Sequence, residues 1–103
     1  MTAKIVVLFG KPTDPQAFDK QYWEEHIPIA RKMPGLRKYT VQKVLNPPRG
    51  EPAYYQVVEL EFDNIESLKK ATASQAGKDS TIHGAKIATG GMTIMFAESK
   101  EAM

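Results

Sequence analysis

Residues 18–39 read FDKQYWEEHIPIARKMPGLRKY and combine a long amphipathic helix with the beginning of a strand. Side chains on one face recur at the helical spacing of about 3.6 residues per turn. This face holds Phe18, Tyr22, His26, Ile29 and Met33. His26 breaks an otherwise apolar face, so the sequence predicts that a histidine points toward the interior.

The helix has clear start and stop signals, and one proline lies inside it. Asp14 can cap the free amides, Pro15 suits the first helical position, and Pro34-Gly35 ends the helix. Pro28 cannot donate a backbone hydrogen bond, so we expect a kink or a break of the helix near His26-Ile27. Two interpretations of His26 stay open: it is a general acid or base, or it only bonds a carbonyl that Pro28 leaves free.

Four segments are predicted to form strands. Residues 3–9 are apolar on both alternations, which is typical of a strand covered on both faces. Residues 36–46 and 54–62 alternate apolar and polar side chains on either side of a proline-rich loop. The last strand is expected after Lys86, up to Ala97. Gly90-Gly91 inside this run indicates a bulge or a close approach of another backbone.

A second helix is predicted after the third strand. Asp63, with Glu66 three residues later, resembles a capping box. Its buried stripe would hold Ile65, Leu68, Ala71 and Thr72. The polar residues 77–84 are expected to be irregular, with at most one short helical turn, and His83 among them to be solvated.

The predicted order is strand, helix, strand, strand, helix, strand. This order is typical of an α+β, ferredoxin-like βαββαβ domain, in which both helices cover one face of a four-stranded antiparallel sheet. Length favours one domain over residues 1–103. The second face of the sheet is half apolar, so we expect a homodimer that packs two sheets face to face into a dimeric α+β barrel.

Composition excludes several classes of function. The net charge is +2 with interspersed signs, which argues against nucleic acid as a partner. The chain has no cysteine, and no His or carboxylate pair has metal-ligand spacing. No apolar run approaches the ~20 residues of a membrane span, and no signal peptide is recognisable. We therefore expect a cytoplasmic protein without a membrane partner.

Aromatic residues suggest a binding cavity beside His26. Tyr39 could donate a hydrogen bond to a carbonyl or enolate oxygen, or it could simply pack on the helix with its hydroxyl at the surface. The residues predicted to line an apolar pocket are Phe9, Tyr22, Trp23 and Tyr54. An ordinary hydrophobic core would use the same residue types.

The pattern Phe18-x3-Tyr22-Trp23-x2-His26-x-Pro28, followed by Met33-Pro34-Gly35-Leu36-x2-Tyr39, resembles the EthD family. The family belongs to the dimeric α+β barrel superfamily, and it includes a methylmuconolactone methylisomerase. In that enzyme the helix histidine and the tyrosine after Pro-Gly-Leu lie at the cavity. The resemblance therefore implies His26 and Tyr39 as catalytic residues.

The chain departs from the family pattern near the last strand, where an Asp followed by an aromatic residue is common. Residues 82–91 read IHGAKIATGG instead, so a mechanism that needs this Asp does not carry over. We expect a small-molecule enzyme without cofactor or metal that acts on a small, largely apolar organic compound, as an isomerase, a monooxygenase-like enzyme or a lyase. The alternatives are a non-catalytic binding or accessory protein of a degradation pathway, a purely structural dimer, and a haem protein, since related barrels bind haem.

Overall fold

A computed structural model describes residues 1–103. Its elements, in chain order, are β1 (Thr2–Phe9), α1 (Pro15–Gln21), a π-helical turn η1 (Tyr22–His26), α2 (Ile27–Ala30), β2 (Lys38–Lys43), β3 (Gln56–Phe62), α3 (Ile65–Ala73), α4 (Gln75–Ile87) and β4 (Met92–Ser99). The four strands form one antiparallel sheet in the order β2-β3-β1-β4. The predicted ferredoxin-like fold is therefore confirmed.

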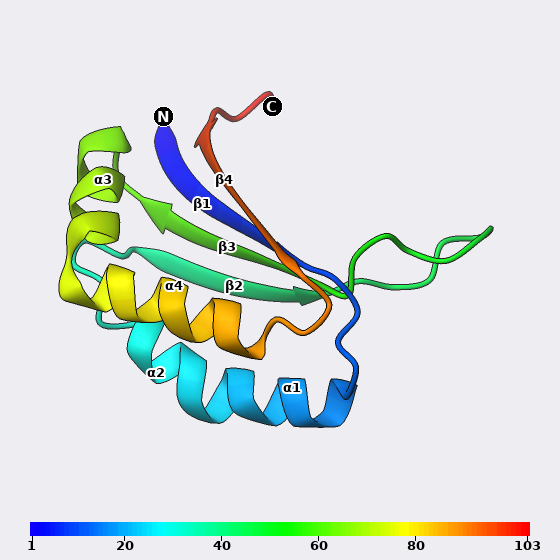
Figure 1. The fold of residues 1–103 in the computed structure, drawn as a ribbon. Helices are drawn as coiled ribbons and strands as arrows, with labels where there is room; N and C mark the ends of the chain where they lie inside the picture. The colour runs from blue at the N-terminus through cyan, green and yellow to red at the C-terminus, as the bar shows by residue number, and fades with distance from the viewer.

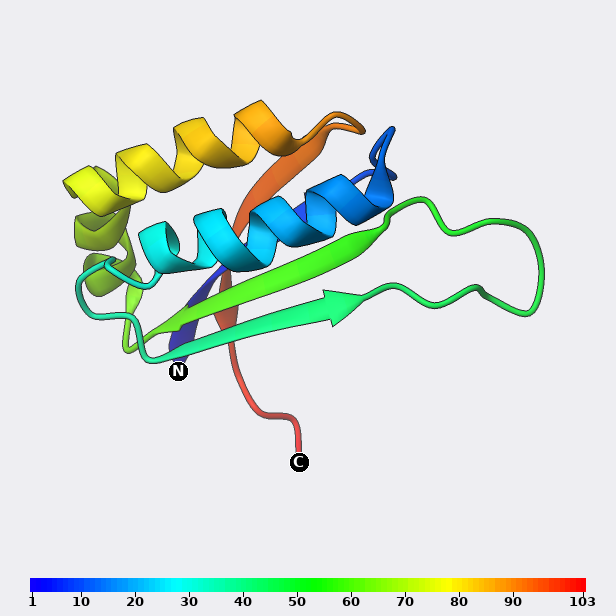
Figure 2. The same cartoon turned by 90° about the horizontal axis from the view of Figure 1, so that it is seen from below.

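The helices lie on one side of the sheet (Figure 1). Figure 2 shows α4 running alongside the continuous α1–η1–α2 helix, so two helical rods cover the same face. The opposite face of the sheet has no helix over it. Both chain ends lie at the same edge of the molecule, because β1 and β4 are antiparallel neighbours.

The core lies between the sheet and the helices. Alternate residues of β1 and β3 point into it and are buried, because side chains alternate between the two faces of a strand. They are Ala3, Ile5, Val7, Phe9, Gln56, Val58, Leu60 and Phe62. The second alternation of β1 is only half-buried in one chain, so the expectation that both faces are covered does not hold within a single chain.

The helix does not break near His26-Ile27, but it contains the π-helical turn η1 just before Pro28. Asp14 caps the rod as expected, because its carboxylate accepts from the Ala17 amide. Farther along, the Ile27 amide donates to the Tyr22 carbonyl, which is the five-residue spacing of a π-helix. The helix then continues through Pro28 to Ala30. Tyr22 and His26 both lie in this turn and are buried.

Two predictions about the second half of the chain are wrong. Asn64, not Asp63, caps α3, since its side chain accepts from the Ser67 amide, and Asp63 pairs with Arg37 instead. Residues 77–84 are not irregular but belong to the 13-residue helix α4. Ser74 starts this helix by accepting from the Gly77 amide, so a single serine cap separates α3 from α4.

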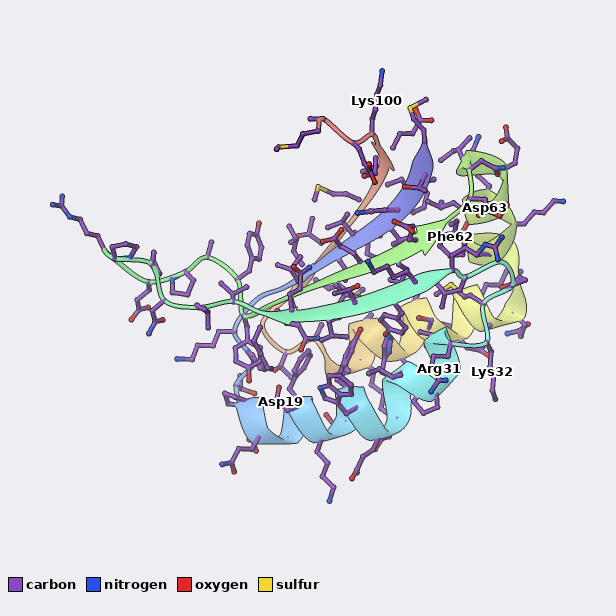
Figure 3. The ribbon with its side chains drawn as sticks, turned by 180° about the vertical axis from the view of Figure 1, so that it is seen from behind. Asp19, Arg31, Lys32, Phe62, Asp63 and Lys100 are labelled. Carbon is purple, nitrogen blue, oxygen red and sulfur yellow. The ribbon has the colours of Figure 1, made fainter.

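The second and third strands are shorter than predicted, because residues 44–55 form a long loop. This loop extends away from the body of the molecule in Figures 1 and 2. In Figure 3, Asp19 lies on α1 at the end of the layer nearest the loop, whereas Arg31 and Lys32 lie toward the opposite end. None of the helices is long and apolar enough to cross a bilayer.

The close backbone approach expected at Gly90-Gly91 is present. A Cβ on Gly90 would lie 2.1 Å from the Lys11 carbonyl oxygen, and a Cβ on Gly10 would lie 2.1 Å from the Gly90 oxygen. The Gly10 amide donates to the Gly91 carbonyl, which joins the end of β1 to the turn before β4. Only glycine allows these two backbones to lie so close together.

Replacing Gly90 with alanine should therefore lower the free energy of unfolding by about 1–3 kcal/mol, the usual cost of forcing extra atoms into a packed site. Gly91→Ala is the matched comparison, because Gly91 has a φ of 96° but no atom within 4 Å of an added Cβ. It tests backbone strain alone. Urea unfolding measures both variants, and equal stability of Gly90→Ala and the parent chain would contradict the close approach.

Candidate functional site

A cavity of about 140 Å³ lies between the sheet and the two helical rods. Its wall is mostly hydrophobic and contains Ile5, Val7, Phe9, Tyr22, His26, Ala30, Met33, Tyr39, Val58, Leu60, Thr72, Gly77, Ser80, Thr81, Met92, Ile94 and Phe96. Ile94 and Phe96 on β4 remain 41% and 54% exposed. The cavity therefore opens to solvent beside the edge strand β4.

Four of the six residues predicted from the sequence lie in this wall. They are His26, Tyr39, Phe9 and Tyr22. Trp23 points away from the cavity with 57% of its surface exposed, and Tyr54 is 39% exposed in the loop before β3. Neither of these two side chains belongs to the wall, so a ligand-binding role for them stays a prediction without support from the cavity.

A stack of rings runs along the inner face of the first helical rod. Phe18 stacks on Tyr22 at 5.9 Å between ring centres, and Tyr22 stacks on His26 at 4.8 Å. His83, from α4, continues the stack at 5.2 Å from His26. This packing fixes the plane of the His26 ring, so its two nitrogens point in defined directions.

Both ring nitrogens of His26 face polar groups on α4. Nδ1 of His26 lies 3.0 Å from Nδ1 of His83, and Nε2 lies 3.5 Å from the Ser80 hydroxyl. On its other side, Nε2 of His83 lies 3.2 Å from a carboxylate oxygen of Glu25. A connected chain of polar groups therefore runs from the cavity wall at Ser80 to the surface at Glu25, which is well exposed.

Burial and the neighbouring His83 lower the pKa of His26 from 6.5 to about 4. Burial is the larger cause, because the charged imidazolium loses its hydration inside the protein. His26 is only 6% exposed. It is therefore neutral at physiological pH, with one bare ring nitrogen that can accept a proton.

Two tyrosine hydroxyls form the second polar group of the cavity. The hydroxyls of Tyr22 and Tyr39 lie 2.6 Å apart. Burial raises the pKa of Tyr39 to about 12, and burial together with the nearby Tyr39 raises the pKa of Tyr22 still further. Both phenols thus stay protonated at neutral pH. Since one hydroxyl donates to the other, the second hydrogen remains free for an oxygen of a ligand.

Sequence reasoning missed the contribution of α4. His83 was expected to be solvated, but its side chain is only 15% exposed and contacts His26. Ser80 was not singled out at all. The available signal was the helical spacing of Gly77, Ser80 and Gly84, of which Ser80 and Gly84 lie beside His26 and Gly77 lies against the end of α3. No three His, Asp or Glu side chains in the structure are arranged to hold a metal ion.

Several solved structures share the fold at low sequence identity. A hydroxynitrile lyase from Passiflora edulis aligns with a TM-score of 0.78 and 11% identity, covering 99% of this chain and 96% of that one. A cofactor-independent oxygenase from Streptomyces nogalater aligns with a TM-score of 0.73 and 12% identity, with the same coverage. A dimeric ferredoxin-like protein of unknown function from Thermobifida fusca aligns with a TM-score of 0.71 and 14% identity over 94% and 90%.

Two other proteins are more similar in sequence. A crystal structure of an ethyl tert-butyl ether degradation (EthD) family protein from Bacillus halodurans has 37% identity and a TM-score of 0.92, covering 97% of this chain and all of that one. An uncharacterised 11.0 kDa protein from Rhodococcus erythropolis is 25% identical over 97% of both chains. The EthD domain model matches residues 11–88. The chain belongs to the EthD family.

Proposed function

We propose that this protein is a cofactor-free enzyme that moves protons on a small, largely apolar organic molecule carrying a carbonyl-type oxygen. One observation carries the proposal: a buried, neutral histidine and a pair of protonated tyrosines share the wall of one apolar cavity. Apolar walls with a few convergent polar groups are typical of small-molecule sites. The presence of enzymes among the fold neighbours is consistent with this proposal.

The size of the cavity limits the substrate. Its 140 Å³ is close to the roughly 150 Å³ of an engineered protein cavity that binds benzene. A single ring or a short branched chain fits this space. His26 and the tyrosine pair are the polar groups that could orient such a molecule, together with the hydroxyls of Ser80, Thr72 and Thr81.

The chemistry follows from the two polar groups. The bare nitrogen of His26 accepts a proton from a carbon next to the carbonyl, and the electron pair of the broken C–H bond forms an enolate. The free hydrogen of the tyrosine pair bonds the enolate oxygen as its charge develops. Return of the proton to the same or another carbon completes an exchange or an isomerisation. Tyr22 stacks directly on His26, which keeps base and donor on one side of the cavity.

Deuterium exchange tests this proposal without knowledge of the natural substrate. Small cyclic ketones and lactones are incubated with the protein in D₂O, and loss of the proton signal next to the carbonyl is followed by NMR. Exchange above the buffer rate for at least one compound is expected. If compounds bind in the cavity but none exchanges, the catalytic proposal fails.

A non-catalytic binding or accessory protein is the second candidate. The low pKa of His26 favours it, because a base with a pKa of about 4 takes up protons reluctantly. This candidate predicts binding of the same ketones and lactones, seen as NMR shifts of residues in the cavity wall, without any exchange. Binding with exchange would exclude it.

Tyr39→Phe is expected to slow exchange about tenfold, a smaller effect than loss of the base. Removing the Tyr39 hydroxyl leaves the hydroxyl of Tyr22, which can donate the hydrogen bond to the ligand oxygen instead. A single hydrogen-bond donor in a transition state is otherwise worth ~10²–10³ in rate. The measurement is the NMR exchange rate at saturating ketone. A fall as large as that of a base deletion would show that Tyr22 cannot replace Tyr39.

The proposal includes a homodimer formed through the open faces of the sheets. On that face Val6, Leu8 and Met95 are partly exposed, beside a pair between Lys4 and Glu59. The dimeric fold neighbour is consistent with such packing. Native mass spectrometry should give twice the 11.5 kDa of one chain. A monomer would contradict this part of the proposal.

We further propose that residues 1–103 act as one domain in the cytoplasm. The EthD match runs from residue 11 to residue 88, so β1 and β4 lie outside it. These two strands are nevertheless neighbours in the same sheet, and they contribute Phe9 and Phe96 to the cavity wall. A single cooperative unfolding transition is expected for one domain. Fractionation of cells that produce the protein tests its location in the cytoplasm.

A further inference from the structure

We propose that His83, paired with Glu25, takes up the Nδ1 proton of His26 when His26 removes a proton from the substrate, so that His26 can act first as a base and then as an acid. The inference rests on the proposed function and assigns a role to two residues that lie outside the cavity wall. His83 and Glu25 are positioning residues in this scheme, because they act only through His26.

The hydrogen-bond chain fixes which nitrogens carry hydrogens. An ionised carboxylate can only accept, so Nε2 of His83 must donate to Glu25. A neutral His83 then has a bare Nδ1, which accepts from Nδ1–H of His26 at 3.0 Å. In neutral His26 the other nitrogen, Nε2, is bare. This is the nitrogen beside Ser80 in the cavity wall, so the resting state presents a base to the substrate.

Proton removal reverses this arrangement in one balanced step. The substrate proton binds Nε2 of His26, and the Nδ1 proton of His26 moves to Nδ1 of His83. His26 is then neutral with a hydrogen on Nε2, and His83 is an imidazolium beside the Glu25 carboxylate. The positive charge is therefore held next to an acidic residue at the surface instead of in the apolar wall.

This transfer removes the difficulty raised by the low pKa of His26. That pKa measures the cost of placing a charge on His26 itself, with His83 beside it. When the charge moves on to His83, His26 ends the step uncharged. The Nε2 hydrogen now faces the cavity, so the same nitrogen can return a proton to another atom of the substrate.

The local sequence offers a matched pair of variants. Glu24 and Glu25 are neighbours in η1, but only Glu25 contacts His83. The chain has two histidines, so the ring nitrogens of both can be assigned without ambiguity in protein made without a histidine tag. The tautomers are read from ¹H–¹⁵N correlations of the ring nitrogens in the parent chain, Glu24→Gln and Glu25→Gln.

The expected result is a hydrogen on Nδ1 and a bare Nε2 on His26 in the parent chain and in Glu24→Gln at pH 7.5. Glu25→Gln should give mixed tautomers on both histidines, because an amide can accept from or donate to His83. A hydrogen on Nε2 of resting His26, or an unchanged pattern in Glu25→Gln, would overturn the proposal.

Exchange kinetics separate this inference from the proposed function. Glu25→Gln should reduce the maximal exchange rate about tenfold with little change in ketone affinity, while Glu24→Gln should behave as the parent. If His26 and His83 have the expected tautomers but no ketone exchanges deuterium, only the proposed function is contradicted. Exchange that is equally fast in Glu25→Gln would overturn only the role of His83 and Glu25.

Discussion

Replacing His26 with glutamine is expected to slow deuterium exchange by at least about 100-fold, since general base catalysis contributes roughly 10²–10⁴ in rate. The amide fills part of the space of the imidazole and can still bond His83 and Ser80, but it cannot accept a full proton. Affinity for the ketone should change little, because the wall around it is mainly apolar.

The matched control is His83→Gln, a variant that removes the other histidine and keeps His26 as the base. His83→Gln preserves a polar partner for His26 but removes the second imidazole, so exchange should fall less than in His26→Gln. Circular dichroism and the urea midpoint must show that both variants fold. Exchange in folded His26→Gln at the rate of the parent chain would exclude His26 as the base.

The fold could be predicted because its signals are local. The apolar run of β1, the alternation in β3, the Asp14 cap and the Pro34-Gly35 stop are each read from a few adjacent residues. The errors occur where tertiary contacts outweigh local propensity. Helix α4 contains two glycines and several polar residues, so its sequence resembles a loop. It is helical because Gly77 allows close contact with the end of α3, and Gly84 lies against His26.

The candidate site could be predicted only in part for the same reason. His26 lies on a helix whose periodicity is clear, Tyr39 was indicated by the resemblance to the family, and both side chains line the cavity. His83 became part of the site only through the long-range packing of α4 against η1, and the helical spacing of small residues in 77–84 does not by itself place His83 beside His26. Trp23 shows the reverse case: it is an aromatic residue within the family-like motif, and 57% of its surface is exposed, so its ligand-binding role stays a prediction.

The second large effect is on stability as a function of pH. The pKa of His26 is about 4 in the folded chain and should be close to 6.5 in the unfolded chain. Between these values the unfolded state binds more protons than the folded state, so acidification favours unfolding. Above about pH 7.5 His26 is neutral in both states, so its titration does not lower the free energy of unfolding. This free energy is expected to fall by ~2 kcal/mol by pH 5 and by ~3 kcal/mol by pH 4 because of His26.

Carboxylates also titrate in this pH range, so the effect of His26 on the free energy of unfolding is obtained by comparing the parent chain with His26→Gln. Urea unfolding of the parent chain and of His26→Gln is measured from pH 8 to pH 5, and the difference between their free energies of unfolding is taken at each pH. That difference should shift by about 2 kcal/mol in favour of the variant as the pH falls. His83→Gln supplies the second test: since His83 lowers the pKa of His26, its loss should make the pH dependence shallower. A difference that stays constant with pH would mean that His26 titrates alike in both states, and the cavity would then not hold a neutral, desolvated base.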